Sequence, residues 1–208
     1  GDQIGTRMVK KTLHHMRLGG VYDHIGLGFH RYSTDRQWFL PHFEKMLYDQ
    51  AMISMACLEA FQLTGNEEYA QIAREIFTYV LRDMTDKDGG FYSAEDADSE
   101  GEEGIFYIWT EKEFMEVLGE EKGKMLAKIY GFTEIGNFHE EATGETTGNN
   151  IPHFPYDQSS LASKVGMNLE VFNSFIESTR EQLFNVRKKR IHPLKDDKIL
   201  TDWNGLMI

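Results

Sequence analysis

Three residues, His42, Lys45 and Asp49, stand at the spacing that brings side chains together on one face of a helix. We expect that helix to begin at Pro41, because proline fits the first position of a helix. His42 would then act as a general acid or base whose protonation state is set by Asp49 or Glu44. The alternative is a cluster of caps and salt bridges at a helix start, where Glu44 also suits the helix dipole.

An acidic stretch between positions 95 and 103 is the second candidate. It holds six carboxylates in nine residues: Glu95, Asp96, Asp98, Glu100, Glu102 and Glu103. Such crowding is expected to raise the pKa of some of these carboxyl groups. Glycoside hydrolysis uses a pair of carboxyl groups of which one has a raised pKa and the other an ordinary pKa. Asp96 and Asp98 are the catalytic candidates, because aromatic segments on both sides would hold them. One alternative is a solvated acidic turn. A second is a calcium-binding loop that begins at Asp96, but Tyr107 stands at the position where an EF-hand has its bidentate Glu.

A loop at positions 21–40 mixes aromatic and ionisable side chains densely, as binding loops do. It contains His24, His30, Arg31, Asp35 and Trp38, which suit stacking on a sugar or holding an anionic group. The alternative is a structured loop whose polar groups satisfy one another.

The tail offers Trp203 and Asn204 as further binding residues. The alternative there is a plain helix start, capped by Thr201 or Asp202.

Helical periodicity predicts the elements that must position these residues. Helices are expected at residues 6–17, 41–64, 67–84, 111–118, 120–130 and 169–186. Gly65 should end the 41–64 helix, and Thr110 and Glu113 should form a capping box at the start of the 111–118 helix. The 41–64 helix is apolar on nearly all sides and should be packed on most of them, whereas the 67–84 helix should have one solvent-exposed face. A buried helix followed by a half-exposed one is the unit of a double-layered α/α toroid.

The remaining segments predict little regular structure. Residues 91–93 and 105–109 are β-prone and flank the acidic stretch, which predicts a small hairpin with a long loop. Residues 132–160 should be mostly loop. No linker rich in Pro, Ser or Gly interrupts the chain, so we expect one domain.

Composition excludes several classes of function. The formal charge of −12 disfavours nucleic acid and anionic membranes as partners. One basic run, at 187–190, suits the end of a helix. The single Cys57 lies in an apolar helical run, and no segment reaches membrane-spanning length, so a cytoplasmic protein is expected. No metal or cofactor is predicted, because His14 and His15 are adjacent and His139 and His153 stand alone.

Four stretches, in order, resemble one family. They are residues 19–24 (GGVYDH) continuing to 28–32 (GFHRY), 41–50 (PHFEKMLYDQ), 93–101 (SAEDADSEG) and 196–205 (DDKILTDWNG). The chain is thereby identified as similar to the toroid part of the YyaL / spermatogenesis-associated thioredoxin-domain protein family. The resemblance implies a mainly α fold, a partial (α/α)6 toroid with a small β-hairpin insertion, similar to N-acylglucosamine 2-epimerase and six-hairpin glycosidases. It also implies that residues 1–208 lack the family's N-terminal thioredoxin-like domain and the C-terminal half of the toroid.

We therefore expect a domain that binds or modifies a carbohydrate, by epimerisation, isomerisation or hydrolysis. The expected catalytic residues are His42, Asp96 and Asp98, and the expected binding residues are His30, Arg31, Trp38, Glu44, Asp49, Trp203 and Asn204. The alternative is a non-catalytic scaffold that binds a protein or peptide and works with the thioredoxin-like domain. An open toroid edge would expose apolar surface, so self-association is also expected.

Overall fold

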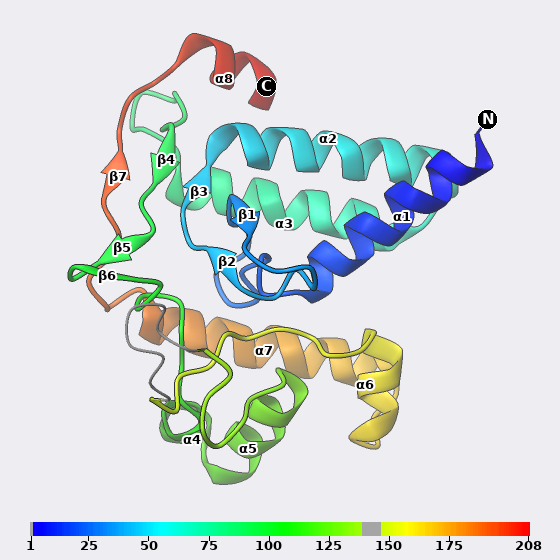
Figure 1. Cartoon of the computed structure of the whole chain (residues 1–208), viewed down its shortest axis with the longest axis vertical. Coiled ribbons are helices and arrows are strands. Elements are labelled where there is room, and N and C mark those ends of the chain that lie inside the picture. The colour runs from blue at the N-terminus through cyan, green and yellow to red at the C-terminus, as the bar shows by residue number, and fades with distance from the viewer. Residues whose placement is uncertain (1, 139–146) are drawn as a thin grey trace.

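Two long helices, packed side by side, dominate the N-terminal part of the fold (Figure 1). In the computed structural model, which describes residues 2–138 and 147–208, these are α2 (Leu47–Thr64) and α3 (Glu67–Asp83). Helix α1 (Gln3–Leu18) runs obliquely across one end of the pair. A buried cluster joins the three helices to the loop after α1, and it includes Tyr22, Leu27, Phe29, Leu47, Ile72, Ile76, Tyr79 and Val80.

A second group of helices forms the lower half of Figure 1. It contains α4 (Glu111–Leu118), α5 (Glu120–Ile129), α6 (Gln158–Lys164) and α7 (Leu169–Arg187). Its separate core includes Trp109, Phe114, Leu126, Tyr130, Phe154, Phe172 and Leu183. The two helical groups therefore have their own cores, and they are joined by the loop after α1, which places Ile25 in the second core, and by Arg82 of α3 over the Phe184 ring of α7.

Short antiparallel strands lie along one side of both groups. Strand β1 (Tyr32–Ser33) pairs with β2 (Pro41–His42), and β5 (Asp98–Ser99) pairs with β6 (Glu102–Glu103). A three-stranded sheet has the order β3-β4-β7, made of Lys45–Met46, Ala94–Glu95 and Lys195–Asp196. The last helix, α8 (Thr201–Met207), packs on α2. The fold is thus mainly α with a small β-hairpin, as the sequence predicts.

The helix expected from Pro41 begins six residues later, at Leu47. Pro41 and His42 are extended in β2, and Lys45 is extended in β3. Proline is compatible with a strand edge as well as a helix start, and pairing with β1 and β4 decides between the two. The prediction that His42, Lys45 and Asp49 share a helical face is therefore wrong, because only Asp49 lies on the helix.

One face of α2 is exposed, although its all-round apolar sequence predicts packing on most sides. The exposed fractions of Met52, Met55 and Leu63 are 52%, 44% and 69%. The opposite face, with Ala51 and Cys57, is buried. The helix is therefore packed on fewer sides than predicted, because the described residues cover only part of its surface.

The acidic stretch itself forms the hairpin, which corrects the predicted pairing of residues 91–93 with 105–109. Phe91 instead bridges to Thr85, and Trp109 bridges to Asn150. Glu100 and Gly101 turn the chain with φ values of 56° and 85°. Two consecutive positive φ values are typical of a tight two-residue hairpin turn, so β5 and β6 need no long loop.

Residues 132–138 and 147–157 are mostly irregular, as expected, and α6 begins at Gln158. Residues 139–146, which include His139, lie outside the described residues. Local signals place the helix ends correctly: Gly65 closes α2 with φ of 67°, and the Thr110 side chain and Glu113 form the capping box of α4.

Candidate functional site

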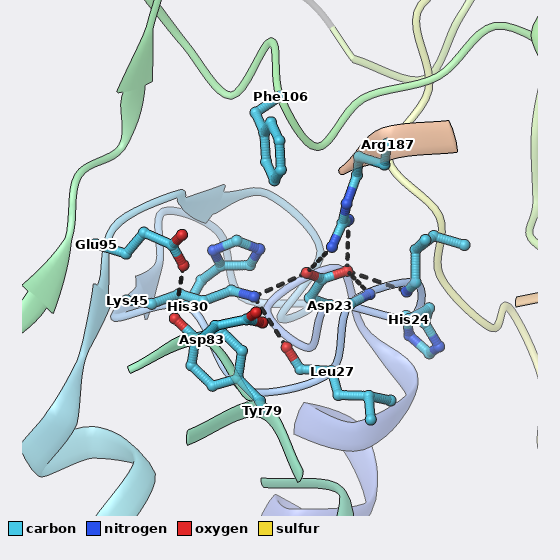
Figure 2. Close-up of polar contacts among 12 residues, drawn as sticks. Asp23, His24, Leu27, His30, Lys45, Tyr79, Asp83, Glu95, Phe106 and Arg187 are labelled. Carbon is cyan, nitrogen blue, oxygen red and sulfur yellow. Dashed lines mark hydrogen bonds and ion pairs between the residues drawn. The ribbon is translucent and has the colours of Figure 1, made fainter. Parts of the chain in front are cut away.

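Asp23 is the centre of a buried ionic cluster (Figure 2). One of its carboxylate oxygens accepts hydrogen bonds from the backbone N–H groups of Ile25 and Gly26, at 3.0 and 2.8 Å. Arg187, from the last turn of α7, donates to both carboxylate oxygens at 2.8 and 2.7 Å. Lys45 donates to the second oxygen at 2.8 Å. Burial alone would raise the pKa of Asp23, but Arg187 and Lys45 outweigh it and hold that pKa well below its usual range.

Lys45 is fully committed within this cluster. Its ammonium group also donates to the Leu27 carbonyl oxygen at 2.9 Å and lies 4.4 Å from the centre of the Tyr79 ring. The Tyr79 hydroxyl donates to Glu95 at 2.7 Å, which fixes a second buried carboxylate beside the cation. Burial lowers the pKa of Lys45, and the carboxylates of Asp23 and Glu95 partly offset that effect. The Lys45 ammonium is thus engaged by Asp23, Leu27 and Tyr79, although Arg187 Nε and the Tyr107 hydroxyl nearby have no hydrogen-bond partner among the described residues. This cluster holds the fold together.

His30 belongs to this buried cluster and not to an exposed binding loop. Its Nδ1 lies 2.8 Å from the Phe43 carbonyl oxygen, and its ring meets the Tyr107 ring edge-on at 4.6 Å. Burial, with the nearby Lys45 charge, lowers the pKa of His30 to about 3. A neutral, buried imidazole of this kind stabilises the interior, which puts the predicted binding residue His30 out of reach of a solvent-borne ligand.

His42 stands at the centre of a second, half-exposed cluster on the surface. Its Nδ1 lies 2.7 Å from Glu103 Oε1, and its Nε2 lies 3.6 Å from Glu44 Oε2. The Tyr32 ring stacks on the imidazole, with ring centres 5.0 Å apart. Glu103 Oε1 also accepts the backbone N–H of Phe43 at 3.2 Å. The imidazole is therefore held by two carboxylates and one aromatic face while part of it stays open to solvent.

Arg31 extends the His42 cluster toward the start of α2. Its guanidinium donates to Glu44 Oε2 at 2.9 Å and to the Tyr48 hydroxyl at 3.1 Å. The Trp203 ring meets the Tyr48 ring edge-on at 4.8 Å. Arg31, Glu44 and Trp203, predicted from distant parts of the sequence, are thus joined to His42 by a continuous set of contacts.

Asp49 follows Tyr48 in the first turn of α2 and is electrostatically coupled to the same cluster. Its Oδ2 is buried and has no hydrogen-bond partner among the described residues. Burial raises the pKa of Asp49 to about 6; the Arg31 charge opposes the rise and the Glu44 charge adds to it. A carboxyl group with this pKa exchanges protons near neutral pH, as a general acid or base must.

A cavity of about 540 Å³ opens beside His42. Its walls are aromatic and aliphatic with a few polar groups, and they include Tyr32, Pro41, His42, Phe43, Glu102, Glu103, Phe138 and Asn149. The volume lies within the range of small-molecule pockets, about 300–1,000 Å³, and the mixture of apolar walls and few polar groups is typical of them.

Both predicted catalytic aspartates are exposed and lie outside the described lining of this cavity. Asp98 is the cross-strand partner of Glu103, so both side chains project from the same face of the β5–β6 hairpin. Asp96 is exposed, its backbone N–H donates to the Leu194 carbonyl oxygen at 2.8 Å, and it is absent from the described lining of the cavity. The hairpin pairing connects Asp98 to the residue that holds His42, but neither aspartate is among the described contacts of His42 or the described lining of the cavity.

Trp38 and Asn204 make structural contacts. Trp38 packs against the core of α1–α3, and its carbonyl oxygen accepts the Val21 N–H at 3.1 Å. Asn204 pairs with the backbone of Phe91, accepting its N–H at 2.8 Å and donating to its carbonyl at 3.0 Å. Both polar ends of the Asn204 amide are thereby used to attach α8 to the segment before β4.

Sequence reasoning missed Asp23 and Arg187 as partners and Glu103 as the residue that orients His42. The basic run at 187–190 lies at the end of α7, as predicted, but two of its members also make specific contacts. Arg187 is buried, and Arg190 donates to the carbonyl oxygens of Phe106 and Ile108 at 2.9 and 2.8 Å. The separations, 164 residues for Asp23–Arg187 and 61 for His42–Glu103, explain why spacing carried no signal.

Within residues 2–138 and 147–208, no group of three or more His, Cys, Asp or Glu side chains is arranged to hold a metal ion. No helix in these ranges is both long and apolar enough to cross a bilayer.

Comparison with known proteins identifies close relatives, although no protein-family model matches the chain. Over 226 aligned residues the chain is 44% identical to spermatogenesis-associated protein 20 of Homo sapiens and 42% identical to the protein of that name of Mus musculus. Each alignment covers 99% of the chain and 29% of the relative. An uncharacterised protein of Caenorhabditis elegans is 34% identical over 97% of the chain and 30% of its own length. The chain thus spans less than a third of each of these relatives.

Proposed function

We propose that this chain, which belongs to the spermatogenesis-associated protein 20 family, binds a carbohydrate-like ligand beside His42 and acts on it by acid–base chemistry. The observation that carries the proposal is the His42 ring, held between Glu103 at 2.7 Å and Glu44 at 3.6 Å on the wall of a 540 Å³ cavity. A half-exposed imidazole oriented by carboxylates is suited to moving a proton to or from a bound hydroxyl or carbon.

Three features of the cavity suit a sugar. The Tyr32 and Phe138 rings provide flat apolar walls for the faces of a pyranose ring. The carboxylates of Glu102 and Glu103 and the amide of Asn149 provide acceptors and a donor for hydroxyl groups. The acidic surroundings disfavour a phosphorylated or otherwise anionic sugar, so a neutral ligand is the better match.

The neighbouring residues take distinct roles in this proposal. Glu103 positions His42 by accepting a hydrogen bond from Nδ1–H, which leaves the Nε2 lone pair for a proton of the ligand. Asp98, on the same hairpin face as Glu103, supplies a second carboxylate. Arg31 and Asp49 form an extension of the site on the α2 side, where Trp203 and Tyr48 offer an aromatic edge. Asp49 would serve as a second proton carrier, because its pKa of about 6 is close to neutral.

The wider setting is also part of the proposal. The helical pairs α2–α3 and α4–α5 are compatible with successive hairpins of an (α/α)6 toroid. The relatives are much longer than the matched region, which is compatible with a function that this region performs together with a thioredoxin-like domain of the same protein. The lone Cys57 is buried, and burial raises its pKa to about 12, as is ordinary for an inert thiol in a reducing, cytoplasmic compartment.

The test is ligand-observed NMR of the full chain with a panel of neutral mono- and disaccharides, in D2O. We expect saturation transfer to at least one sugar, lost in His42→Ala and retained in His192→Ala, an exposed histidine outside the cavity. Deuterium incorporation at a carbon-bound position would assign proton abstraction, hence epimerisation or isomerisation; new reducing ends would assign hydrolysis. Binding of unrelated peptides but no sugar, or sugar binding that survives His42→Ala, would overturn the proposal in favour of a non-catalytic scaffold.

A further inference from the structure

Helix α1 concentrates positive charge in a protein that is otherwise strongly acidic. Between Gln3 and Leu18 the sequence contains Arg7, Lys10, Lys11 and Arg17 and no Asp or Glu, whereas the whole chain carries a formal charge of −12. Arg7, Lys10 and Lys11 are exposed. The rest of the surface is therefore more acidic than the net charge suggests, and α1 is a cationic element in it, separate from the basic run at 187–190.

The cations of α1 point into a groove and not simply into bulk solvent. Residues 3, 6, 7, 10, 11, 14 and 15 recur at spacings of three and four, which defines one helix face, and all of them line a groove of about 790 Å³. The other wall is the turn between α2 and α3, with Leu63, Asn66, Glu68 and Tyr69. Figure 1 shows this geometry, in which α1 crosses the end of the α2–α3 pair.

Among the residues that the structure describes, no Asp or Glu forms a salt bridge with Arg7, Lys10 or Lys11; His14 approaches Glu68 at 3.9 Å. Like charges three and four residues apart on a helix repel each other and destabilise it. A helix face that packs against the rest of its own chain is usually apolar. A cationic face that lines a groove is therefore better suited to a binding partner than to packing within the chain.

We propose that the groove between α1 and the α2–α3 turn is a docking site for an acidic peptide segment of a partner protein. Charge complementarity favours an anion, and the length favours a peptide over a small ion: from Gln3 to His15 the helix rises about 18 Å, the span of five to six extended residues. Leu63 is 69% exposed on the opposite wall and provides an apolar contact between the acidic positions. This site is independent of His42 and of the proposed carbohydrate activity.

The experiment uses fluorescence anisotropy of the full chain with three fluorescein-labelled peptides. The probe is a 12-residue peptide alternating pairs of Glu with single Leu; in one control Gln replaces Glu, and in the other Lys replaces Glu. We expect only the Glu peptide to bind, in the micromolar range, with affinity falling as salt is raised from 50 to 300 mM. Because the chain as a whole repels acidic peptides, binding of this probe reports a local cationic surface.

Charge-reversal variants then locate the binding. Lys10→Glu combined with Lys11→Glu should weaken the Glu peptide by about tenfold or more, since four units of charge change at the groove. The matched control is Lys122→Glu with Lys128→Glu, two exposed lysines on α5 with the same total change of charge. These positions are exposed, so both double variants should keep the circular dichroism spectrum and melting temperature of the wild type.

Each outcome is decisive. Loss with the α1 variant and retention with the α5 variant supports the proposal, as does protection of the 3–15 amides in hydrogen exchange when the Glu peptide is added. No binding of the Glu peptide, or equal weakening by the two double variants, overturns it. Binding to anionic phosphatidylserine vesicles without binding of the peptide would also overturn it, because the groove would then serve a lipid surface.

Discussion

Asp23 and Arg187 form a buried ion pair that joins the loop after α1 to the last turn of α7. Two hydrogen bonds of 2.8 and 2.7 Å link the side chains, and each is only 3% exposed. Most buried residues of the loop belong to the core of α1–α3, whereas Ile25 of the same loop and Leu183 of α7 belong to the other core. With Lys45 as a second cation on the same carboxylate, this pair is a principal polar connection between the two helical groups.

Removing Arg187 should destabilise the protein strongly. Arg187→Met leaves a buried carboxylate with one of its two cations, and breaking a buried ion pair in this way typically costs about 3–5 kcal/mol. We expect that loss in the free energy of unfolding measured with urea. The control is Arg74→Met on α3, whose pair with Glu67 at 3.9 Å is exposed; it should change stability by less than about 0.5 kcal/mol. Similar effects of the two substitutions would contradict the assigned role of Asp23–Arg187.

His30 should make the protein sensitive to acid. Its pKa in the fold is about 3, and in the unfolded chain about 6.5. The unfolded state therefore binds a proton first, so stability is complete above pH 6.5 and is lost as pH falls toward 3. Between pH 7 and pH 4 the wild type should lose about 3 kcal/mol more than His30→Asn, whose amide can still donate to the Phe43 carbonyl. Equal pH dependence of the two proteins, in urea unfolding at each pH, would count against a buried neutral imidazole.

The parts of the fold that sequence predicts well depend on neighbouring residues alone. Gly65 and the Thr110–Glu113 capping box mark helix ends because their effects act within one turn. The error at Pro41 has the opposite origin. Pro41–His42 and Lys45–Met46 are extended because they pair with residues 8 to 50 positions away, such as Tyr32 with His42 and Lys45 with Glu95. Local propensity contains no information about such pairing.

The candidate site was only partly predictable for the same reason. Arg31, His42, Glu44, Asp49 and Trp203 are distinctive residue types, so composition singled them out, and the structure joins them by contacts. Glu103 resembles the other acidic residues of its stretch, and only the tight turn at Glu100–Gly101 directs it to His42. His30 and Trp38 were included because aromatic and ionisable residues look alike in sequence whether they are buried or exposed.

Asp49 should destabilise the protein at neutral and alkaline pH. Burial raises its pKa to about 6 from 3.8, so the folded state holds a proton that the unfolded state has lost. The resulting stabilisation is complete below about pH 4 and disappears as pH rises through 6. Asp49→Asn should therefore be about 1 kcal/mol more stable than the wild type at pH 7.5, since solvent screens a partly exposed side chain, and equally stable at pH 3.5. Glu59→Gln, at an exposed position of α2, should show no such pH-dependent gain in thermal melts.

The exposed face of α2 should cause self-association at high concentration. Met52, Met55 and Leu63 lie on one helix and are 52%, 44% and 69% exposed, and clustered apolar surface favours association. Light scattering should show a concentration-dependent increase in mass for the wild type, reduced in Met52→Glu with Met55→Glu. Ile135→Glu, which removes a similarly exposed apolar residue outside α2, should leave the association unchanged. A wild type that stays monomeric at millimolar concentration would contradict this expectation.

Glu103 should decide which nitrogen of the neutral His42 ring carries the proton. Glu103 Oε1 lies 2.7 Å from Nδ1, and an ionised carboxylate can only accept a hydrogen bond, so the Nδ1–H tautomer is favoured. In free imidazole side chains the Nε2–H form is the commoner one, and long-range ¹H–¹⁵N spectra distinguish the two. We expect Nδ1–H in the wild type and a shift toward Nε2–H in Glu103→Ala. Glu102→Ala, which alters the adjacent residue on the other face of β6, should leave the tautomer unchanged. If Glu103→Ala also leaves it unchanged, Glu103 does not position His42, and the proposed acid–base role loses its orienting carboxylate.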